Sequence, residues 1–347
     1  MTPEGYFDMR HLSSPRSEPG DCPIQGCKAT LGKAGSQWGD LPYCPQHRIR
    51  IHAGTQTFVY YNGADPASKR DAALRNILFE RKYFGQHVLG NAAKAETHRI
   101  CHETSEDALT WNVFSALATA GVLPALIAQF AQVDVRSEPE LYLWGLRIQC
   151  DNSSTPKQFE PLIGARDAYE KGITRFLTEP DIMIYVPGQV LLLVEAKFTS
   201  GNTVAVSNAS HDLAGEKPKS REGIARRYSP DSLPAGSLVV APSTGPFYSQ
   251  LYRNLVFAMH MANARGVRWG LVSLVGEKQF QLRESTAEFQ DPSHFIHGIL
   301  PPSSHEQFRF HSWERLYNDH IAKSSDLAAL AEYMSNKSAN GAQALAI

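Results

Sequence analysis

The chain has 347 residues, of which 42% are hydrophobic and 20% are charged, which is enough for one large domain or two smaller ones with a buried core. The formal net charge of -1 at pH 7 excludes overall basicity as a means of binding nucleic acid, so such a surface must come from local clusters of Lys and Arg. The five cysteines are an odd number, which in a cytosolic protein favours metal binding or free thiols over a disulfide framework.

The N-terminal segment, residues 1–20, is polar and contains several Pro and Ser residues, a composition typical of disorder. It lacks the basic start, the apolar middle and the small-residue cleavage site of a secretory signal. We therefore expect a cytoplasmic protein.

Cysteine and histidine side chains are concentrated in residues 21–60. Cys22 and Cys27 are separated by four residues, and Cys44 and His47 are separated by two. Two close pairs of this kind are typical of a structural Cys₃His zinc site, whose closed tetrahedron leaves no position for a substrate. The sequence around them is rich in Gly and Pro and offers little core, so we predict a zinc-binding module whose fold depends on the metal.

The stretch HRIRIH continues this module, and it places Arg48 and Arg50 on one side of an extended segment. We predict that both arginines contact phosphate groups. Residues 61–96 follow as a helical connector, because apolar residues recur there at spacings of three and four.

Residues 108–133 carry no charged side chain and are long enough for a membrane span to be considered. Their polar residues and Pro124 favour a buried helix that is broken near the proline. We therefore expect no membrane association. Upstream of this run, Ser105 is a good N-cap for the helix.

The region from about residue 97 to residue 320 reads as an α/β domain in which helices flank a mixed central sheet. Residues 200–245 interrupt it with Gly, Ser, Pro and charged residues, which predicts a long loop. Arg226 and Arg227 in this loop are candidates for a positively charged channel for nucleic acid. Residues 321–347 are expected to form a C-terminal helix and a tail that frays after Ser335.

The stretch EPDIMIYVPGQVLLLVEAKF, residues 179–198, carries the strongest chemical signal. Two aliphatic runs are separated by Pro-Gly-Gln, which predicts a β-hairpin centred on Gly188. Asp181 and Glu195 each lie seven residues from that glycine, so they face each other across the two strands, and period-2 alternation adds Lys197 to the same face. Two carboxylates at this distance repel each other unless a cation lies between them, and Mg²⁺ or Mn²⁺ meets that need.

This arrangement of Pro180 and Asp181 before Glu195, Ala196 and Lys197 resembles the PD-(D/E)XK nuclease superfamily, which includes restriction endonucleases. The resemblance implies a restriction-endonuclease-like core and metal-dependent hydrolysis of phosphodiester bonds. It also implies that Asp181, Glu195 and the Ala196 carbonyl bind the metal, and that Lys197 acts on the attacking water. A solvent-exposed strand end is the simpler alternative for Glu195 and Lys197.

The same superfamily usually adds an acid from a helix that precedes the sheet, and our candidate is Glu106, ahead of Glu103. The helix dipole gives a purely local reason for acids in a first helical turn. The helix over residues 247–266 offers Gln250 and Arg253 as substrate contacts, which match the superfamily pattern loosely. The polar face of an amphipathic helix is the alternative for both residues.

We therefore predict a cytoplasmic, Mg²⁺-dependent endonuclease that acts on DNA and carries a structural zinc module. Restriction or anti-phage defence is one setting for such an enzyme, and a homodimer is one assembly that the sequence leaves open. The alternatives are a non-catalytic nucleic-acid-binding protein on the same fold and an interaction adaptor built around the zinc module. RNA is the alternative substrate.

Overall fold

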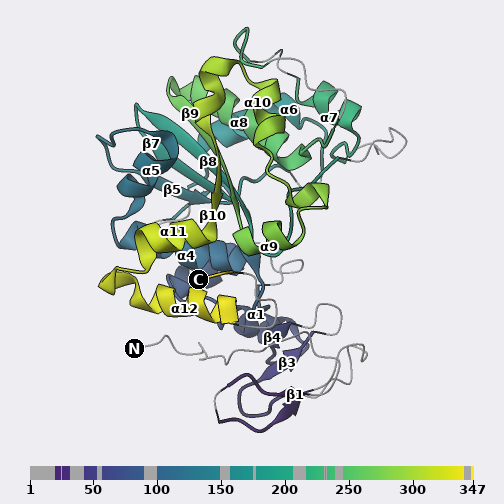
Figure 1. Ribbon diagram of the computed structural model, residues 1–347, viewed down its shortest axis with the longest axis vertical. Helices are drawn as coiled ribbons and strands as arrows, with labels where there is room; N and C mark the ends of the chain where they lie inside the picture. Colours follow the sequence, from purple (N-terminus) through teal and green to yellow (C-terminus); the bar gives the residue numbers. More distant parts are fainter. Residues whose placement is uncertain are drawn as a thin grey trace. The chain divides into compact units, whose positions relative to one another are not determined.

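The computed structural model describes most of the chain, and its helices and strands are shown in Figure 1. The described residues are 20–24, 26–31, 43–52, 57–89, 100–148, 157–174, 177–205, 216–229, 231, 233–238, 245–339 and 345–347. They divide into two compact units, of which the first contains residues 1–120, 276–279 and 313–347, and the second contains residues 121–275 and 280–312. The expected disorder of residues 1–20 falls almost entirely outside the described residues.

The second unit is built on a six-stranded mixed sheet flanked by helices, which confirms the predicted α/β class (Figure 1). The strands lie in the order β10-β9-β8-β7-β5-β6. Neighbours from β6 to β8 are antiparallel, whereas β8, β9 and β10 run parallel. The strands are β5 (Glu140–Leu143), β6 (Leu146–Arg147), β7 (Ile182–Val186), β8 (Val190–Lys197), β9 (Arg268–Val275) and β10 (Phe308–Ser312).

The hairpin formed by β7 and β8 has the predicted register. Ile182 pairs with Val194, and Val186 pairs with Val190, so the turn is centred on Gly188. The φ of Gly188 is +73°, a left-handed conformation that glycine adopts without steric cost. The sequence prediction of this turn is therefore confirmed.

Alternation along β8 determines which side chains face helix α8. Leu191 and Leu193 pack in one core cluster with residues of α8, so Glu195 and Lys197 lie on the same face of the sheet. Continuing the hairpin register by one pair places Asp181 opposite Glu195. The face that α8 covers thus holds all three charged residues of the hairpin tip.

Helix α8 (Ser249–Arg265) packs against β8 and β9. It is followed by Gly266, whose φ of +63° is a left-handed conformation typical of a helix C-terminus. Helices α6 and α7 pack against α8, α5 contacts β8 and β9, and α10 contacts β10. Their bounds are α5 (Leu123–Ala131), α6 (Glu160–Tyr169), α7 (Arg221–Arg227) and α10 (Ser293–Ile299), with the short helices η4 (Ala287–Phe289) and η5 (Pro302–Gln307) beside them in the chain.

The first unit contains two small antiparallel sheets and several helices. The strand pairs are β1 (Gly20–Asp21) with β2 (Thr30–Leu31), and β3 (Ile49–Ile51) with β4 (Phe58–Tyr60). The helices are α1 (Pro66–Leu74), α2 (Arg81–Tyr83), α4 (Glu106–Thr119), α11 (Trp313–Leu316) and α12 (Ala328–Ala339), with π-helical η1 (Phe84–Val88) and η6 (Tyr317–Ile321) and the 3₁₀ turn η7 (Ser325–Leu327). Helix α9 (Glu277–Leu282) contains residues of both units.

The uncharged run of residues 108–133 forms two helices, as predicted. Ser105 caps α4, because its hydroxyl oxygen accepts a hydrogen bond from the Ala108 N–H at 3.1 Å, and α5 begins one residue before Pro124. Within the described residues, no single helix is long and apolar enough to cross a membrane. Helices α4 and α5 together reach that length and apolar composition, but they are bent by 111° at the break between them.

Two sequence predictions need correction. The segment predicted as a long loop contains α7, whose N-cap Ser220 accepts a hydrogen bond from the Gly223 N–H at 3.0 Å. This helix has seven residues and few apolar positions, so its periodicity is too short to detect. The tail predicted to fray after Ser335 remains helical as far as Ala339, and within it the Lys337 ammonium is buried and donates to the Glu103 carbonyl.

The loop after β8 is held by a close backbone approach at Gly201. A Cβ atom added to Gly201 would lie 2.6 Å from the carbonyl oxygen of Glu288. The N–H of Asn202 donates to the same carbonyl at 2.7 Å. Because both partners are backbone atoms, neither can move aside by changing a rotamer.

We predict that Gly201→Ala lowers the free energy of unfolding by about 1–3 kcal/mol, since the backbone must shift to accept the methyl group. Gly164→Ala is the matched control, because an added Cβ on this helical glycine meets nothing within 4 Å, and it should be stabilising by up to about 1 kcal/mol. Urea unfolding followed by circular dichroism measures both changes. Equal midpoints for the two variants would contradict the close approach.

Candidate functional site

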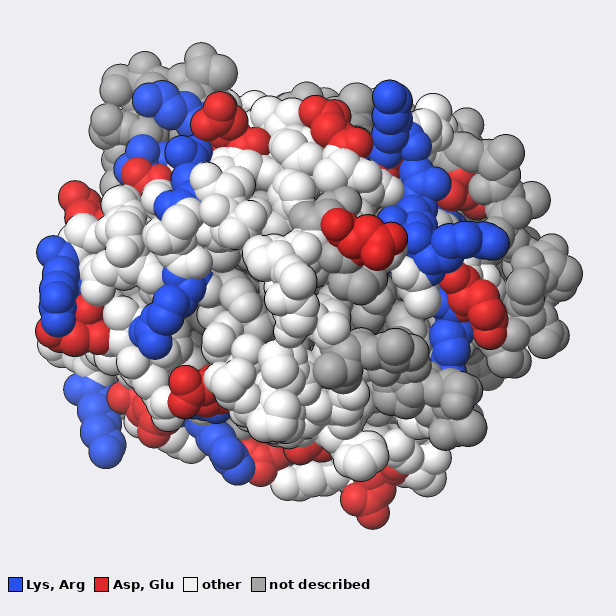
Figure 2. All heavy atoms as spheres, turned by 90° about the horizontal axis from the view of Figure 1, so that it is seen from above, with Lys and Arg blue, Asp and Glu red and all other residues white. Residues whose placement is uncertain are grey.

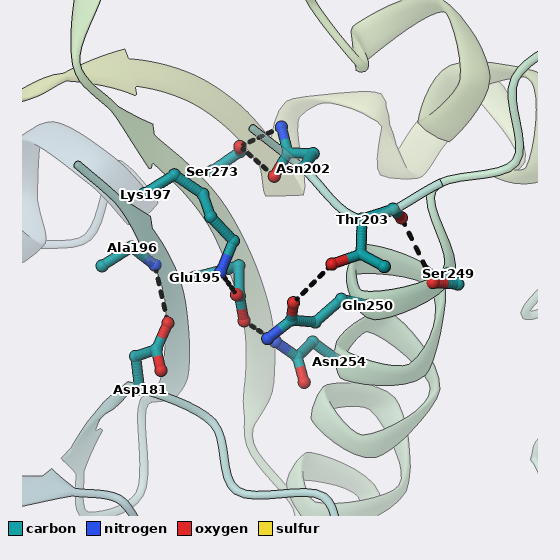
Figure 3. Close-up of polar contacts among 10 residues, drawn as sticks. All are labelled: Asp181, Glu195, Ala196, Lys197, Asn202, Thr203, Ser249, Gln250, Asn254 and Ser273. Atoms are coloured by element: carbon teal, nitrogen blue, oxygen red, sulfur yellow. Dashed lines mark hydrogen bonds and ion pairs between the residues drawn. The ribbon is translucent and has the colours of Figure 1, made fainter. Parts of the chain in front are cut away.

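The charged tip of the β7–β8 hairpin forms the candidate site (Figure 3). Asp181 precedes β7, and its Oδ2 atom accepts a hydrogen bond from the Ala196 N–H at 2.9 Å. This bond fixes the Asp181 carboxylate beside the end of β8, which also carries Glu195 and Lys197. The structure therefore brings together the four residues that the sequence placed at one strand end.

Glu195 is a buried carboxylate whose two oxygens both have partners. Its side chain is fully buried, and that of Lys197 is 7% exposed. The Oε1 atom accepts from the Lys197 ammonium, and the Oε2 atom accepts from the Asn254 amide at 2.6 Å. A buried carboxylate without such partners would be strongly destabilising. The alternative of a solvent-exposed strand end is therefore wrong for Glu195 and Lys197.

Further buried polar side chains lie next to Glu195 on the same face. Ser273 on β9 is its neighbour in the parallel register. The Asn202 amide donates to the Ser273 hydroxyl oxygen at 3.3 Å, and both residues are at most 1% exposed. Figure 3 shows this pair on the side of Lys197 away from Asp181. The end of β8 is thus a polar region inside an apolar sheet.

Helix α8 supplies two amide side chains one turn apart. Gln250, a predicted substrate contact, accepts a hydrogen bond from the Thr203 hydroxyl at 3.3 Å, and Asn254 donates to Glu195. Figure 3 shows both amides on the side of α8 that faces β8. Asn254 was not among the residues predicted from the sequence. Its spacing of four residues from Gln250, which places both on one helix face, was the available signal.

The predicted third acid, Glu106, is the first residue of α4 and is half-buried. It belongs to the first unit, whereas Asp181 and Glu195 belong to the second. Glu103 is 2% exposed, and its Oε1 atom accepts the Phe58 N–H at 2.8 Å. Glu103 thus anchors β4 within the first unit, and the role of Glu106 stays a prediction.

The predicted basic residues differ in their surroundings. Arg226 is exposed, but Arg227 donates to the backbone carbonyls of Tyr169 at 2.9 Å and Lys171 at 2.6 Å. Arg227 therefore joins α7 to the end of α6. On the face shown in Figure 2, Lys and Arg side chains are interleaved with Asp and Glu, in agreement with the near-zero net charge.

Arg48 and Arg50 do not form one exposed side of an extended segment, as the sequence suggested. Arg48 is exposed but has a φ of +48°, which is a turn conformation. Arg50 is 8% exposed, and its guanidinium carbon lies 4.2 Å from the centroid of the Tyr61 ring. Arg50 is therefore part of the local core, and phosphate contact by Arg48 stays a prediction.

The four predicted ligands of the first unit do lie close together. The ligand atoms of Cys22, Cys27, Cys44 and His47 are all within 4.8 Å of one another and could hold a metal such as zinc. The Cys27 and Cys44 sulfurs are 3.7 Å apart, and His47 Nδ1 lies 3.5 Å from the sulfurs of Cys22 and Cys44. These separations fit a tetrahedron with Zn–S bonds of about 2.3 Å and Zn–N bonds of about 2.0 Å, whose edges are roughly 3.5–3.8 Å.

Burial and local hydrogen bonds shift the pKa values of two thiols in this cluster and hold the turn that carries two of its residues. Burial raises the pKa of the Cys22 thiol to about 12. Burial acts in the same direction on Cys44, but the backbone N–H of His47 and the neighbouring thiols outweigh it and lower the pKa of Cys44. Arg75, which caps the C-terminus of α1, donates to the carbonyl of Arg48 at 3.0 Å. The turn that presents Cys44 and His47 is thereby fixed to the following helix.

Comparisons with known proteins found no related protein. A scan against protein-family models found no match, and searches of curated proteins and of solved structures found no match either. The geometry of the two clusters is therefore the basis for a function.

We predict that Cys44→Ser lowers the zinc content of the purified protein from about one atom per chain, because four ligands are needed to close the site. The region of residues 21–60 should then become sensitive to protease, since metal binding and folding are coupled. Cys101→Ser is the matched control, because Cys101 packs beside the cluster without belonging to it. Elemental analysis showing unchanged zinc in Cys44→Ser would refute the metal site.

We also predict that Asn254→Leu lowers the free energy of unfolding by about 1–3 kcal/mol, since the buried Glu195 carboxylate loses a hydrogen-bond donor. Asn263→Leu on the exposed part of the same helix should change it by less than about 0.5 kcal/mol. Chemical denaturation of both variants measures the difference. Equal effects would mean that the amide does not support Glu195.

Proposed function

We propose that the protein is a metal-dependent nuclease that hydrolyses phosphodiester bonds in DNA, and that its second unit has a restriction-endonuclease-like core. The observation that supports this proposal most is the hairpin tip, which places Asp181, Glu195 and Lys197 on one face beside α8. Two carboxylates and a lysine at a strand end are the groups that metal-assisted phosphodiester hydrolysis requires.

The metal ligands in this proposal are all oxygens. Asp181 and Glu195 offer carboxylates, and Ala196 offers its carbonyl, a donor set that suits Mg²⁺ or Mn²⁺. When bound, such an ion would polarise a phosphoryl oxygen and make a bound water more acidic. The Ala196 N–H holds one oxygen of Asp181, and Asn254 holds one oxygen of Glu195, so both carboxylates are oriented by the protein before a metal arrives.

Lys197 supplies positive charge at the same place. Its ammonium is paired with Glu195, and an ammonium carries three N–H donors. In the proposed reaction these donors orient the attacking water and stabilise the negative charge that develops on the phosphate. Burial strengthens this effect, because the low local dielectric increases electrostatic interactions.

The energetics of burial favour catalysis over a purely scaffolding role. A buried ion pair such as Glu195 and Lys197 commonly contributes less to stability than apolar residues of the same volume would. A non-catalytic DNA-binding protein or an adaptor gains nothing evident from keeping these charges inside the sheet. For the first unit we propose structural zinc, with binding to DNA or to a protein partner as its role.

We predict that substitutions of the three charged residues have different effects on metal binding and on cleavage. Asp181→Asn and Glu195→Gln should lose both Mn²⁺ binding and DNA cleavage, because a hard cation needs the charged oxygens. Lys197→Ala should keep Mn²⁺ binding but reduce the chemical step by roughly 10²- to 10³-fold, as expected for loss of one electrostatic stabiliser.

Calorimetric Mn²⁺ titration and single-turnover cleavage of a plasmid measure the two effects separately. Glu284→Gln, an exposed acid on the second unit, is the charge-matched control and should behave as the parent. Cleavage by Lys197→Ala at the parent rate would remove the hairpin tip from the mechanism.

A further inference from the structure

A second buried carboxylate in the second unit, Glu170, is satisfied in a different way from Glu195. Glu170 is 2% exposed and follows the end of α6. Its carboxylate accepts the Thr178 N–H at 2.7 Å, the Thr178 hydroxyl, and the Tyr228 hydroxyl at 2.8 Å. Three neutral donors therefore already stabilise this charge.

Lys217 lies beside this carboxylate without forming a hydrogen bond to it. Its Nζ atom is 3.7 Å from the Glu170 Oε1 atom, and its side chain is 18% exposed. The separation is longer than a charge-assisted hydrogen bond of about 2.7–2.9 Å. The ammonium is thus held in the fold and still has donors to offer.

Arg253 on α8 brings a second positive charge to the surroundings of Lys217. The preceding residue, Tyr252, donates its hydroxyl to the Tyr228 carbonyl at 3.3 Å, and the Tyr228 hydroxyl donates to Glu170. Burial lowers the pKa of Lys217 to about 8, Glu170 and Glu179 act to raise it, and Arg253 and Arg166 act to lower it. Arg166 is engaged elsewhere, since it donates to the Thr178 carbonyl and pairs with Glu179. Within the described part of the chain, the Arg253 guanidinium has no hydrogen-bond or ion-pair partner.

Two cations that repel each other in a partly buried place favour an anion between them. Arg253 lies one helical turn from Gln250 and directly before Asn254, so this position is on the same stretch of α8 as the candidate catalytic site. An anion bound beside Arg253 can therefore be one phosphate of a nucleic-acid strand that has another phosphate at Glu195.

We propose that Lys217 and Arg253 form a binding site for a phosphate group of the nucleic-acid backbone. The identity of the polymer rests on the nuclease function proposed above, whereas the anion chemistry rests on these two residues and on Glu170. Glu170 anchors Lys217 at a distance that leaves the ammonium available, and Arg253 provides the fork-shaped donor that suits a phosphate.

The first test uses inorganic phosphate and does not depend on nuclease activity. Phosphate at constant ionic strength should raise the thermal unfolding midpoint of the parent protein and of the control Lys219→Met, whose side chain is 63% exposed. It should raise the midpoints of Lys217→Met and Arg253→Met clearly less. Equal increases in all four proteins would overturn the proposed site.

The second test measures binding of a DNA duplex by fluorescence anisotropy without added divalent metal. Lys217→Met and Arg253→Met should each weaken binding by about tenfold and should reduce the slope of log K against log salt by about one. Lys219→Met should leave both unchanged. Parent-like affinity and slope in Lys217→Met would overturn the phosphate contact.

The pH dependence separates a bound ammonium from a structural contact. Binding by the parent should weaken as the pH rises above about 8, because Lys217 loses the proton that carries its charge. Lys217→Arg should bind well and lose this dependence, since arginine stays protonated, and it also controls for folding. A parent-like pH profile in Lys217→Arg would contradict the proposal.

The two proposals can fail separately. If the parent neither binds nor cuts DNA but the phosphate effect depends on Lys217 and Arg253, then the anion site stands and the nuclease function is wrong. If the parent cuts DNA and Lys217→Met matches it in every assay, then the anion site is wrong and the nuclease function stands.

Discussion

The charge of Glu195, buried at the end of an interior strand of the sheet, is the constraint on which the arrangement of the second unit depends. A carboxylate in this position is tolerated because Lys197 on its own strand and Asn254 on α8 both donate to it. These bonds require α8 to lie over the end of β8 with one defined rotation about its axis. The apolar residues of the strand then pack against the same helix.

The two buried carboxylates of the second unit have partners of different charge, and this difference affects the cation beside each of them. Glu195 is neutralised by a cation, Lys197, whereas Glu170 is solvated by the neutral donors of Thr178 and Tyr228. In the first case the cation and the acid form one compact group at the strand end. In the second case the nearby cation, Lys217, is left with capacity to bind a further anion.

The first unit uses a different source of stability around its N-terminal cluster. Strands β1 and β2 have two residues each, too few to form a core by themselves. Cys22 and Cys44 are nevertheless buried, together with Leu31 and Ile49. A metal that joins these cysteines would replace the apolar area that so short a segment lacks.

The sequence predicted features that depend on neighbouring residues. The hairpin register followed from the positions of Gly188 and the two aliphatic runs, and the helix start at Ser105 followed from its capping side chain. The grouping of the four candidate metal ligands followed from the spacing of Cys44 and His47 and of the two earlier cysteines. In each case the information lies within a short stretch or in a known ligand pattern.

Features that depend on distant contacts were missed. Asn254 is 59 residues from its partner Glu195. Its spacing from Gln250 indicates a shared helix face but not the pairing with Glu195. The burial of Lys337 depends on Asn76 and Glu103, and a terminal segment rich in polar residues gives no sign of it. Arg50 was expected at the surface because of its charge, but the Tyr61 ring covers its guanidinium.

The central claim is that the oxygens at the hairpin tip hold one divalent metal ion. A crystal structure of the protein soaked with Mn²⁺, with anomalous data collected for manganese, tests it most directly. The account predicts an anomalous peak in contact with the carboxylates of Asp181 and Glu195 and with the Ala196 carbonyl, with the Lys197 ammonium nearby. Manganese bound elsewhere, with the Asp181 and Glu195 carboxylates metal-free at saturating Mn²⁺, would contradict it.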